Sequence, residues 1–122
     1  MEKDSTRRPL VWEGSAKRDF MRFPEPVQKD MGVALFLVQL GGTPPSAKPL
    51  KGMGTGVFEL IGDHRGDTYR AVYVVKISDM VHVLHAFQKK SKSGIKTPKE
   101  DIALIEQRLK GVLRRHQTDE RE

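Results

Sequence analysis

The sequence contains no cysteine among its 122 residues and no long apolar run. Without cysteine the chain has no disulfide, thiol nucleophile or thiolate metal site, so the fold must be stabilised by its hydrophobic core. The longest apolar stretch, residues 33–38, is far shorter than the roughly 18 residues that a membrane-spanning helix needs. The first residues form no apolar signal core. We therefore expect a soluble, cytoplasmic protein.

The composition is that of one basic globular domain. Lys and Arg number 22 against 16 Asp and Glu, which gives a net charge of +6. The hydrophobic share is 37%, and adding the 11 glycines (about 9%) brings it to the level of ordinary folded domains. We predict a single domain over residues 9–115, with disordered polar tails at 1–8 and 116–122.

The N-terminal half predicts a short strand followed by two helices. Residues 10–12 are β-prone, and Ser15 is suited to cap a short helix that Pro24 ends. Pro26 suits the first turn of a second helix, which Gly41 would end. This helix contains the apolar run, which is apolar nearly all round and so indicates a helix buried against a sheet. A buried strand is the alternative, because a short apolar run has no decisive period.

The C-terminal half predicts a sheet and a third helix. After a Gly- and Pro-rich loop at 41–56, three β-rich runs at 57–61, 68–77 and 80–87 indicate an antiparallel meander. Thr97 is a candidate N-cap, with Pro98 and Glu100 completing a capping box. The helix stripe that follows consists of Ile102, Ile105, Leu109 and Val112. The fold class is therefore α+β: a small, mainly antiparallel sheet with two N-terminal helices and a C-terminal helix.

The excess positive charge is concentrated in residues 89–99, KKSKSGIKTPK. This segment has five lysines and no acid, so it accounts for +5 of the net +6. Clustered lysines are suited to replace the counterions of a polyphosphate. A solvated loop is the equally open alternative.

Arg70 and two histidines are unusual in strands that are otherwise apolar. Arg70 either pairs with Glu59 on the neighbouring strand or grips a phosphate. Strand alternation places His82 and His85 on opposite faces, which argues against a shared metal ion. His85 would share a face with Val83 and Phe87 and is either a core residue or a proton-transfer group.

Three short motifs make the chain resemble a known family. They are FEL at 58–60, TYRAVY at 68–73 and VLHAFQKKSKSGIKTP at 83–98. With the predicted order of elements, they resemble the RelE/ParE toxin superfamily, most closely its phage-derived HigB-like branch, over about residues 9–114. The resemblance implies a RelE-like fold and a type II toxin-antitoxin toxin. It implies a ribosome-dependent, metal-independent mRNA endoribonuclease that inhibits translation and needs no cofactor.

The resemblance also implies partners and roles for individual residues. Its partners would be the ribosome with its mRNA and a helix-turn-helix antitoxin of the Xre/HigA type, in a toxin-antitoxin hetero-oligomer. The implied catalytic residues are Arg70 for the phosphate, His85 as the base, and Lys89 and Lys90 for the backbone or the leaving group. The candidate RNA-binding residues are Arg65, Phe87, Lys92, Lys96 and Lys99. The chain departs from RelE-type enzymes at Glu59 and Ile61, where they have lysines, and it has no tyrosine near its C-terminus.

Two other functions are compatible with the same features. One is inhibition of DNA gyrase, as in the ParE branch, without RNA cleavage. The other is a basic, non-catalytic nucleic-acid-binding protein of phage origin.

Overall fold

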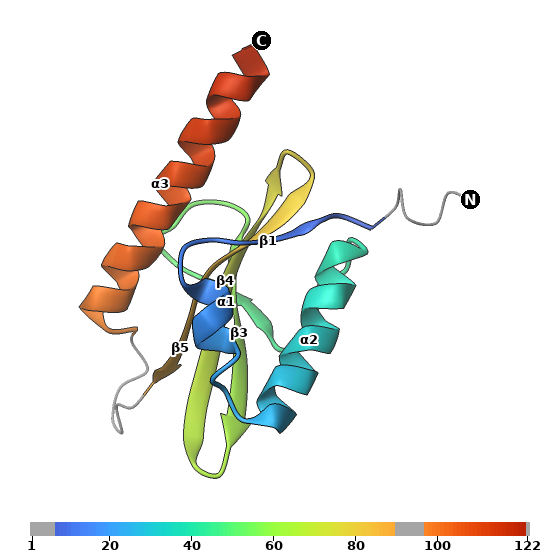
Figure 1. Cartoon of the computed structure of the whole chain (residues 1–122), viewed down its shortest axis with the longest axis vertical. Coiled ribbons are helices and arrows are strands. Elements are labelled where there is room, and N and C mark those ends of the chain that lie inside the picture. Colours follow the sequence, from blue (N-terminus) through green and yellow to red (C-terminus); the bar gives the residue numbers. More distant parts are fainter. Residues whose placement is uncertain (1–6, 90–96, 122) are drawn as a thin grey trace.

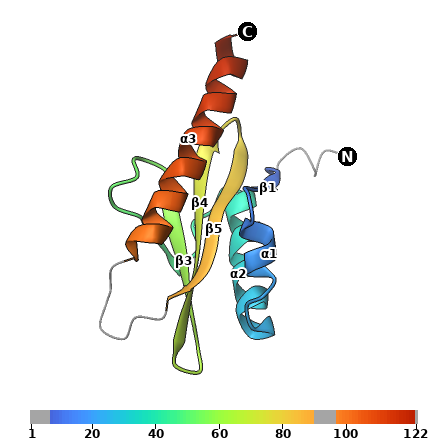
Figure 2. The same cartoon turned by 60° about the vertical axis from the view of Figure 1, so that its left-hand side comes forward.

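The fold is a three-layer α+β arrangement in which one sheet lies between two helical layers (Figure 1). The computed structural model describes residues 7–89 and 97–121, with side chains as far as residue 116. Turning the molecule shows α1 (Ala16–Phe20) and α2 (Glu25–Gln39) on one face of the sheet and α3 (Lys99–Arg121) on the other (Figure 2). The predicted fold class and the order of its helices are confirmed.

The sheet has five strands in the order β1-β5-β4-β3-β2. The predicted meander is present as β3 (Val57–His64), β4 (Asp67–Ile77) and β5 (Met80–Lys89), all antiparallel. The predicted first strand, β1 (Leu10–Trp12), pairs parallel with β5. The loop predicted over 41–56 is wrong in one detail, because it contains the short edge strand β2 (Ala47–Pro49). An edge position tolerates Pro49, which has no N–H to donate to a further strand.

Neither predicted N-cap residue, Ser15 or Thr97, makes the capping hydrogen bond that the sequence predicts. Ser15 precedes α1, but its hydroxyl donates to the Asp19 carboxylate (2.8 Å) and makes no side-chain bond to the helix backbone. At α3 the Pro98 carbonyl accepts from the Ile102 N–H (3.0 Å), so Thr97 lies outside the helix. The helix continues to Arg121, through residues that the sequence predicted as a tail. Of the predicted N-terminal tail, residues 1–6 lie outside the described part of the chain.

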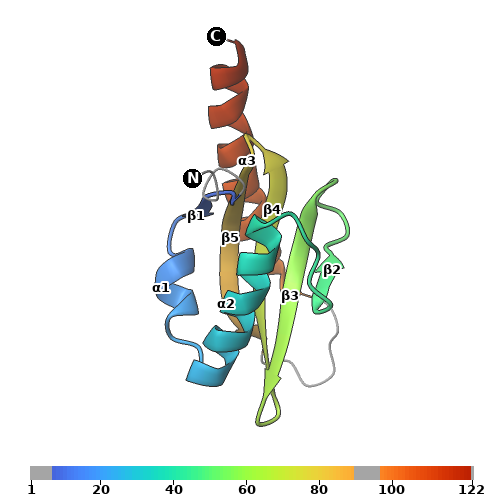
Figure 3. The ribbon, with the colours of Figure 1, turned by 90° about the vertical axis from the view of Figure 1, so that its right-hand side faces the viewer.

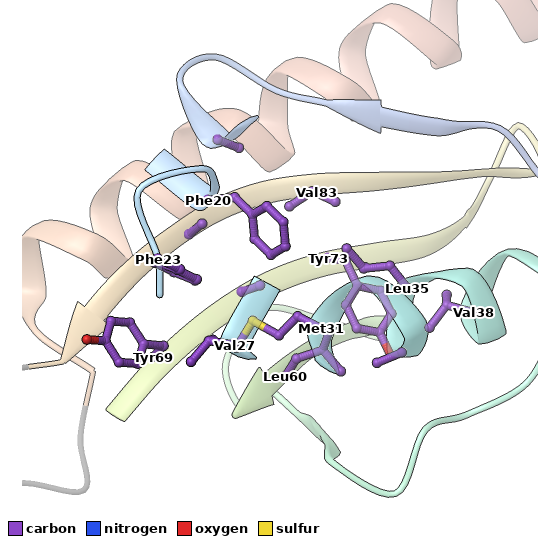
Figure 4. Close-up of a cluster of buried hydrophobic side chains, with 14 of the residues drawn as sticks. Phe20, Phe23, Val27, Met31, Leu35, Val38, Leu60, Tyr69, Tyr73 and Val83 are labelled. Carbon is purple, nitrogen blue, oxygen red and sulfur yellow. The ribbon is translucent and has the colours of Figure 1, made fainter. Parts of the chain in front are cut away.

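The larger core cluster lies between the sheet and α1 and α2. Trp12, Phe20, Phe23 and Tyr69 form a chain of tilted ring contacts with centroids 5.0–5.6 Å apart. Figure 4 shows the aromatic side chains meeting the α2 side chains over the strands. Burial raises the pKa of Tyr73, which lies in this cluster, to about 12. The second cluster lies under α3; its helix members are Ile105, Leu109 and Val112.

The outer face of α2 is not buried. The helix prediction for its apolar run is correct, and the strand alternative is wrong. The outer side of the helix is not covered, because Val33 is 71% exposed and Leu40 is 50% exposed. Only the inner face, with residues such as Leu35 and Val38, packs on the sheet.

A bulge in β5 changes which residues share a face of the sheet. Val72 pairs with His85 but Tyr73 pairs with Val83, so Leu84 is an extra residue. Because of this extra residue, His85 and Val83 lie on opposite faces of the sheet, although strict alternation would put them on the same face. His85 therefore lies opposite Val72 on the α3 face, and not with Val83 as predicted.

His82 pairs with Val74, which belongs to the core cluster under α3. His82 and His85 therefore lie on the same face, which corrects the prediction that they point apart. No group of three His, Cys, Asp or Glu residues suited to a metal ion occurs within the described residues. Within the same residues, no helix is long and apolar enough to cross a membrane.

Candidate functional site

The candidate site is a polar cluster on the α3 face of the sheet, where β3, β4 and β5 lie under the first turn of α3. The register brings its members together, since Arg70 pairs with Phe87 and Thr68 pairs with Lys89. His85 lies two residues before Phe87 on the same strand. Four of the nine predicted site residues, those at positions 70, 85, 87 and 89, are thus neighbours on one face.

Arg70 forms a buried ion pair with Glu59. Its Nη1 lies 2.7 Å from Glu59 Oε1, and each side chain is 11% exposed. The Nε of Arg70 is buried and has no hydrogen-bond partner among the described residues. The structure thus shows the Glu59 pairing that the sequence left open, with part of the guanidinium still unsatisfied.

Lys89 is a buried cation with no hydrogen-bond partner among the described residues. The residue is 5% exposed, and no described group accepts a hydrogen bond from its Nζ. Burial lowers the pKa of Lys89, the charge of Arg70 lowers it further, and Glu59 opposes both effects. Glu59, Arg70 and Lys89 together carry one net positive charge when ionised, so this part of the cluster is suited to hold an anion.

His85 is held by a carboxylate of α3. Its Nε2 lies 2.7 Å from Asp101 Oδ1, and its ring stacks on Phe87 with centroids 4.9 Å apart. The Nδ1 is buried with no hydrogen-bond partner among the described residues. An imidazole held by a carboxylate through one nitrogen can take a proton on the other. Asp101 was missed by sequence reasoning, because an acidic residue in a first helical turn is common for helix-dipole reasons alone.

An open cavity of about 430 Å³ adjoins the cluster at Glu59. Lys48 and Lys51 line it from the β2 side, and Thr97 and Ile102 line it from the start of α3. Both lysines are exposed. They were missed because the sequence places them in a Gly- and Pro-rich loop with no visible link to the strands.

The remaining predicted residues are not part of this cluster as described. Arg65 is exposed in the β3–β4 turn, and Lys99 is exposed at the first position of α3. Phe87, inside the cluster, is 9% exposed and stacks on the His85 ring, and its contact with RNA stays a prediction. Lys90, Lys92 and Lys96 lie outside the described residues.

A second polar cluster attaches the later turns of α3 to the sheet. Arg115 Nη2 lies 3.0 Å from both oxygens of Glu13, and Glu13 Oε2 lies 3.0 Å from His82 Nδ1. His116 contacts the His82 ring edge-on and pairs with Ser78 across 2.7 Å. These contacts hold His82 through Nδ1 and its ring, while its Nε2 is buried with no hydrogen-bond partner among the described residues.

Fold and cluster together define a small basic α+β domain with a partly unsatisfied cationic cluster under a helix. The chain belongs to the family described as phage-derived protein Gp49-like, whose model matches residues 18–110. This match confirms the phage-derived family; the HigB-like branch stays a prediction.

The search of solved structures matches this chain to a chain of the toxin-antitoxin complex RelBE2 from Mycobacterium tuberculosis. Its matching chain is 21% identical with a TM-score of 0.47, over 70% of this chain and 95% of that chain. The comparison with curated proteins found no match.

Proposed function

We propose that this protein is the toxin of a type II toxin-antitoxin system and cuts mRNA on the ribosome. The RelE/HigB-like motifs and the Gp49-like family support the toxin class. The observation that carries the activity is a pair of cations, Arg70 and Lys89, on one sheet face beside the His85–Asp101 pair. Lys89 Nζ has no hydrogen-bond partner in the described part of the chain.

The proposed reaction is attack of a ribose 2′-oxygen on the adjacent phosphorus. The new P–O2′ bond replaces the P–O5′ bond, leaving a 2′,3′-cyclic phosphate and a 5′-hydroxyl. His85 Nδ1 takes the 2′-hydroxyl proton, while Asp101 stabilises the resulting imidazolium through Nε2. Arg70 stabilises the charge that develops on the phosphate oxygens.

Lys89 supplies the proton for the leaving 5′-oxygen. Its pKa is lowered by burial and by Arg70, which makes the ammonium a stronger acid than an exposed lysine. A general acid works best when its pKa approaches the ambient pH. Lys90 would bind the RNA backbone next to it, as the sequence resemblance implies.

RNA reaches these groups only when the cover of the site opens. Arg70, His85 and Lys89 are each less than a tenth exposed. Asp101 and the partly buried Ile102, both in the first turns of α3, lie over the face. We propose that Ile102 moves aside on the ribosome while Asp101 keeps its contact with His85, and that Lys48 and Lys51 guide the phosphate backbone toward the opening.

One observation favours a second function, non-catalytic nucleic-acid binding. Glu59 already occupies Arg70, and a carboxylate at that point repels an incoming phosphate. If Glu59 stays in place, the basic surface can bind RNA without cleaving it. The ParE-like inhibition of DNA gyrase has no such support in the site.

The test is induced expression in bacteria, with cell growth and mRNA cleavage sites read in parallel. We expect growth arrest and new 5′-hydroxyl mRNA ends for the wild type. Arg70→Ala, His85→Ala and Lys89→Met each lower cleavage by about a hundredfold or more, since each removes a group used in the transition state. Lys110→Ala, which removes an exposed cation of α3, leaves cleavage unchanged.

The outcomes separate the candidate functions. Intact cleavage in all three site variants would show that the cluster is not the active site. RNA binding without cleavage by the wild type supports the non-catalytic protein, and loss of supercoiling without cleavage supports gyrase inhibition. Co-expression of a helix-turn-helix protein encoded by a neighbouring gene restores growth if it is the cognate antitoxin.

A further inference from the structure

Glu59 on β3 has a cationic side chain on each of its two neighbouring strands. On the β4 side its carboxylate pairs with Arg70 across 2.7 Å. On the other side, β2 lies beside β3 at the edge of the sheet (Figure 3), and the register puts Lys48 directly opposite Glu59. Residues directly opposite in an antiparallel pair share a face, with Cβ atoms about 4.5–5.5 Å apart. A lysine and a glutamate side chain together span that separation, so the Glu59 carboxylate can reach Lys48 as well as Arg70.

The two cations stand in different surroundings. Arg70 is buried, and its Nε has no hydrogen-bond partner among the described residues. Lys48 is exposed, and within the described part of the chain it forms no ion pair. Glu59 and Lys48 both line the open cavity of about 430 Å³. Glu59 therefore stands at the boundary between the buried cluster and the cavity.

The Glu59 carboxylate occupies the position on Arg70 that suits a phosphate. The guanidinium of an arginine binds carboxylate and phosphate oxygens with the same donors. While Glu59 stays on Arg70, an incoming phosphate meets a negative charge at this point. With Glu59 turned away, the charges of Arg70 and Lys89 both act on the phosphate, and Arg70 Nε and Lys89 Nζ are donors that no described residue uses.

We propose that Glu59 exchanges its ion-pair partner when RNA binds: its carboxylate moves from Arg70 to Lys48, and the scissile phosphate takes its place on Arg70. The identity of this phosphate rests on the proposed function. Breaking a buried ion pair alone leaves an uncompensated buried charge, which is strongly destabilising. In the exchange each charge keeps a partner, because the phosphate replaces Glu59 on Arg70 and Lys48 replaces Arg70 on Glu59. Lys48 is thus a positioning residue that acts through Glu59.

The test is the affinity of the purified full chain for inorganic phosphate, measured by titration calorimetry at constant ionic strength. This measurement needs neither the ribosome nor cleavage. Glu59→Gln keeps the size and a hydrogen-bond acceptor for Arg70 but removes the charge, so we expect phosphate to bind about tenfold more tightly. Lys89→Met weakens binding by about tenfold, which places the phosphate at the cluster.

Variants of the exposed Lys48 test the exchange without disturbing the buried cluster. Lys48→Met weakens phosphate binding about fivefold, because Glu59 loses its second partner, whereas Lys48→Arg keeps the affinity within about twofold. Lys51→Met is the comparison: it removes the same charge from the same cavity, but position 51 does not pair with Glu59, so it costs less than Lys48→Met. In the Glu59→Gln background the two lysine substitutions have equal effects, since no carboxylate is left to receive.

An affinity that Glu59→Gln leaves unchanged overturns the exchange. Equal losses for Lys48→Met and Lys51→Met in the otherwise wild-type chain also overturn it, because Lys48 then acts only as one more exposed charge. These outcomes are separate from those for the enzyme. A wild type that cuts mRNA but gives either result keeps the proposed activity and loses the exchange. A protein that binds phosphate as expected but cuts no mRNA keeps the exchange and loses the proposed activity.

Discussion

Lys89 is the residue in which stability and proposed activity conflict most clearly. Its ammonium is buried beside another cation, with no described hydrogen-bond acceptor. Burying a charge without a partner costs free energy of folding. Such a cost is typical of functional sites, where the group is placed for a ligand that comes later.

Replacing Lys89 by methionine measures the free-energy cost of burying its ammonium group. Met keeps most of the volume and removes the charge, so we expect the free energy of unfolding to rise by about 1–2 kcal/mol while cleavage is lost. Urea denaturation of both proteins measures the difference. A Lys89→Met protein less stable than the wild type would mean that the ammonium is satisfied in the folded protein.

The same substitution changes the pH dependence of stability. Because the folded pKa of Lys89 lies below its ordinary 10.5, the unfolded chain binds more protons between these two values. Wild-type stability therefore rises with pH across that window relative to Lys89→Met. The buried Tyr73 lowers stability above about pH 10 in both proteins and cancels in the difference. Urea denaturation at about pH 8 and pH 10 measures the difference in free energy of unfolding between the two proteins. A difference that does not change with pH contradicts the lowered pKa.

The residues of the site were partly predictable from the sequence. Arg70, Lys89 and His85 stand out because polar groups are rare in apolar strands, and the Arg70–Glu59 pair follows from neighbouring strands. Asp101 could not be predicted, since its approach to His85 depends on where α3 crosses the sheet.

At the level of elements, the β5 bulge and the attachment of α3 decide the geometry of the site. His85 shares the α3 face with Phe87 by ordinary alternation, and the bulge at Leu84 separates it from Val83 and brings His82 to the same face. Arg108 of α3 donates to the Leu84 carbonyl (2.8 Å) and to Ser15 Oγ (3.0 Å), so the helix is fastened at the bulge itself. Strand alternation alone could not predict this, because a single extra residue leaves no clear sequence signal.

Arg108→Met tests whether Arg108 attaches α3 to the sheet. The substitution leaves the Leu84 carbonyl without its donor, so we expect a loss of about 1–2 kcal/mol in the free energy of unfolding. Lys110→Met, at an exposed position of the same helix, changes stability by less than about 0.5 kcal/mol. Chemical denaturation measures both, and equal effects would show that Arg108 does not hold the helix.

The whole molecule has two faces with different tasks. One face of the sheet carries the larger core under α1 and α2. The other carries the cationic cluster under α3. The meander, the helix order and the α+β class follow from periodicity and turn residues, and the structure confirms them. Strand β2 and the exposed outer face of α2 could not be predicted, because three residues are too few for a period and an apolar run does not show which side is covered.

The measurement that tests the central claim most directly is cleavage of ribosome-bound mRNA by the purified protein, with the chemistry of the ends determined. The account predicts 2′,3′-cyclic phosphate and 5′-hydroxyl ends for the wild type, and none for a folded Lys89→Met protein. Cleavage by Lys89→Met at the wild-type rate, or no cleavage by the wild type, would contradict it.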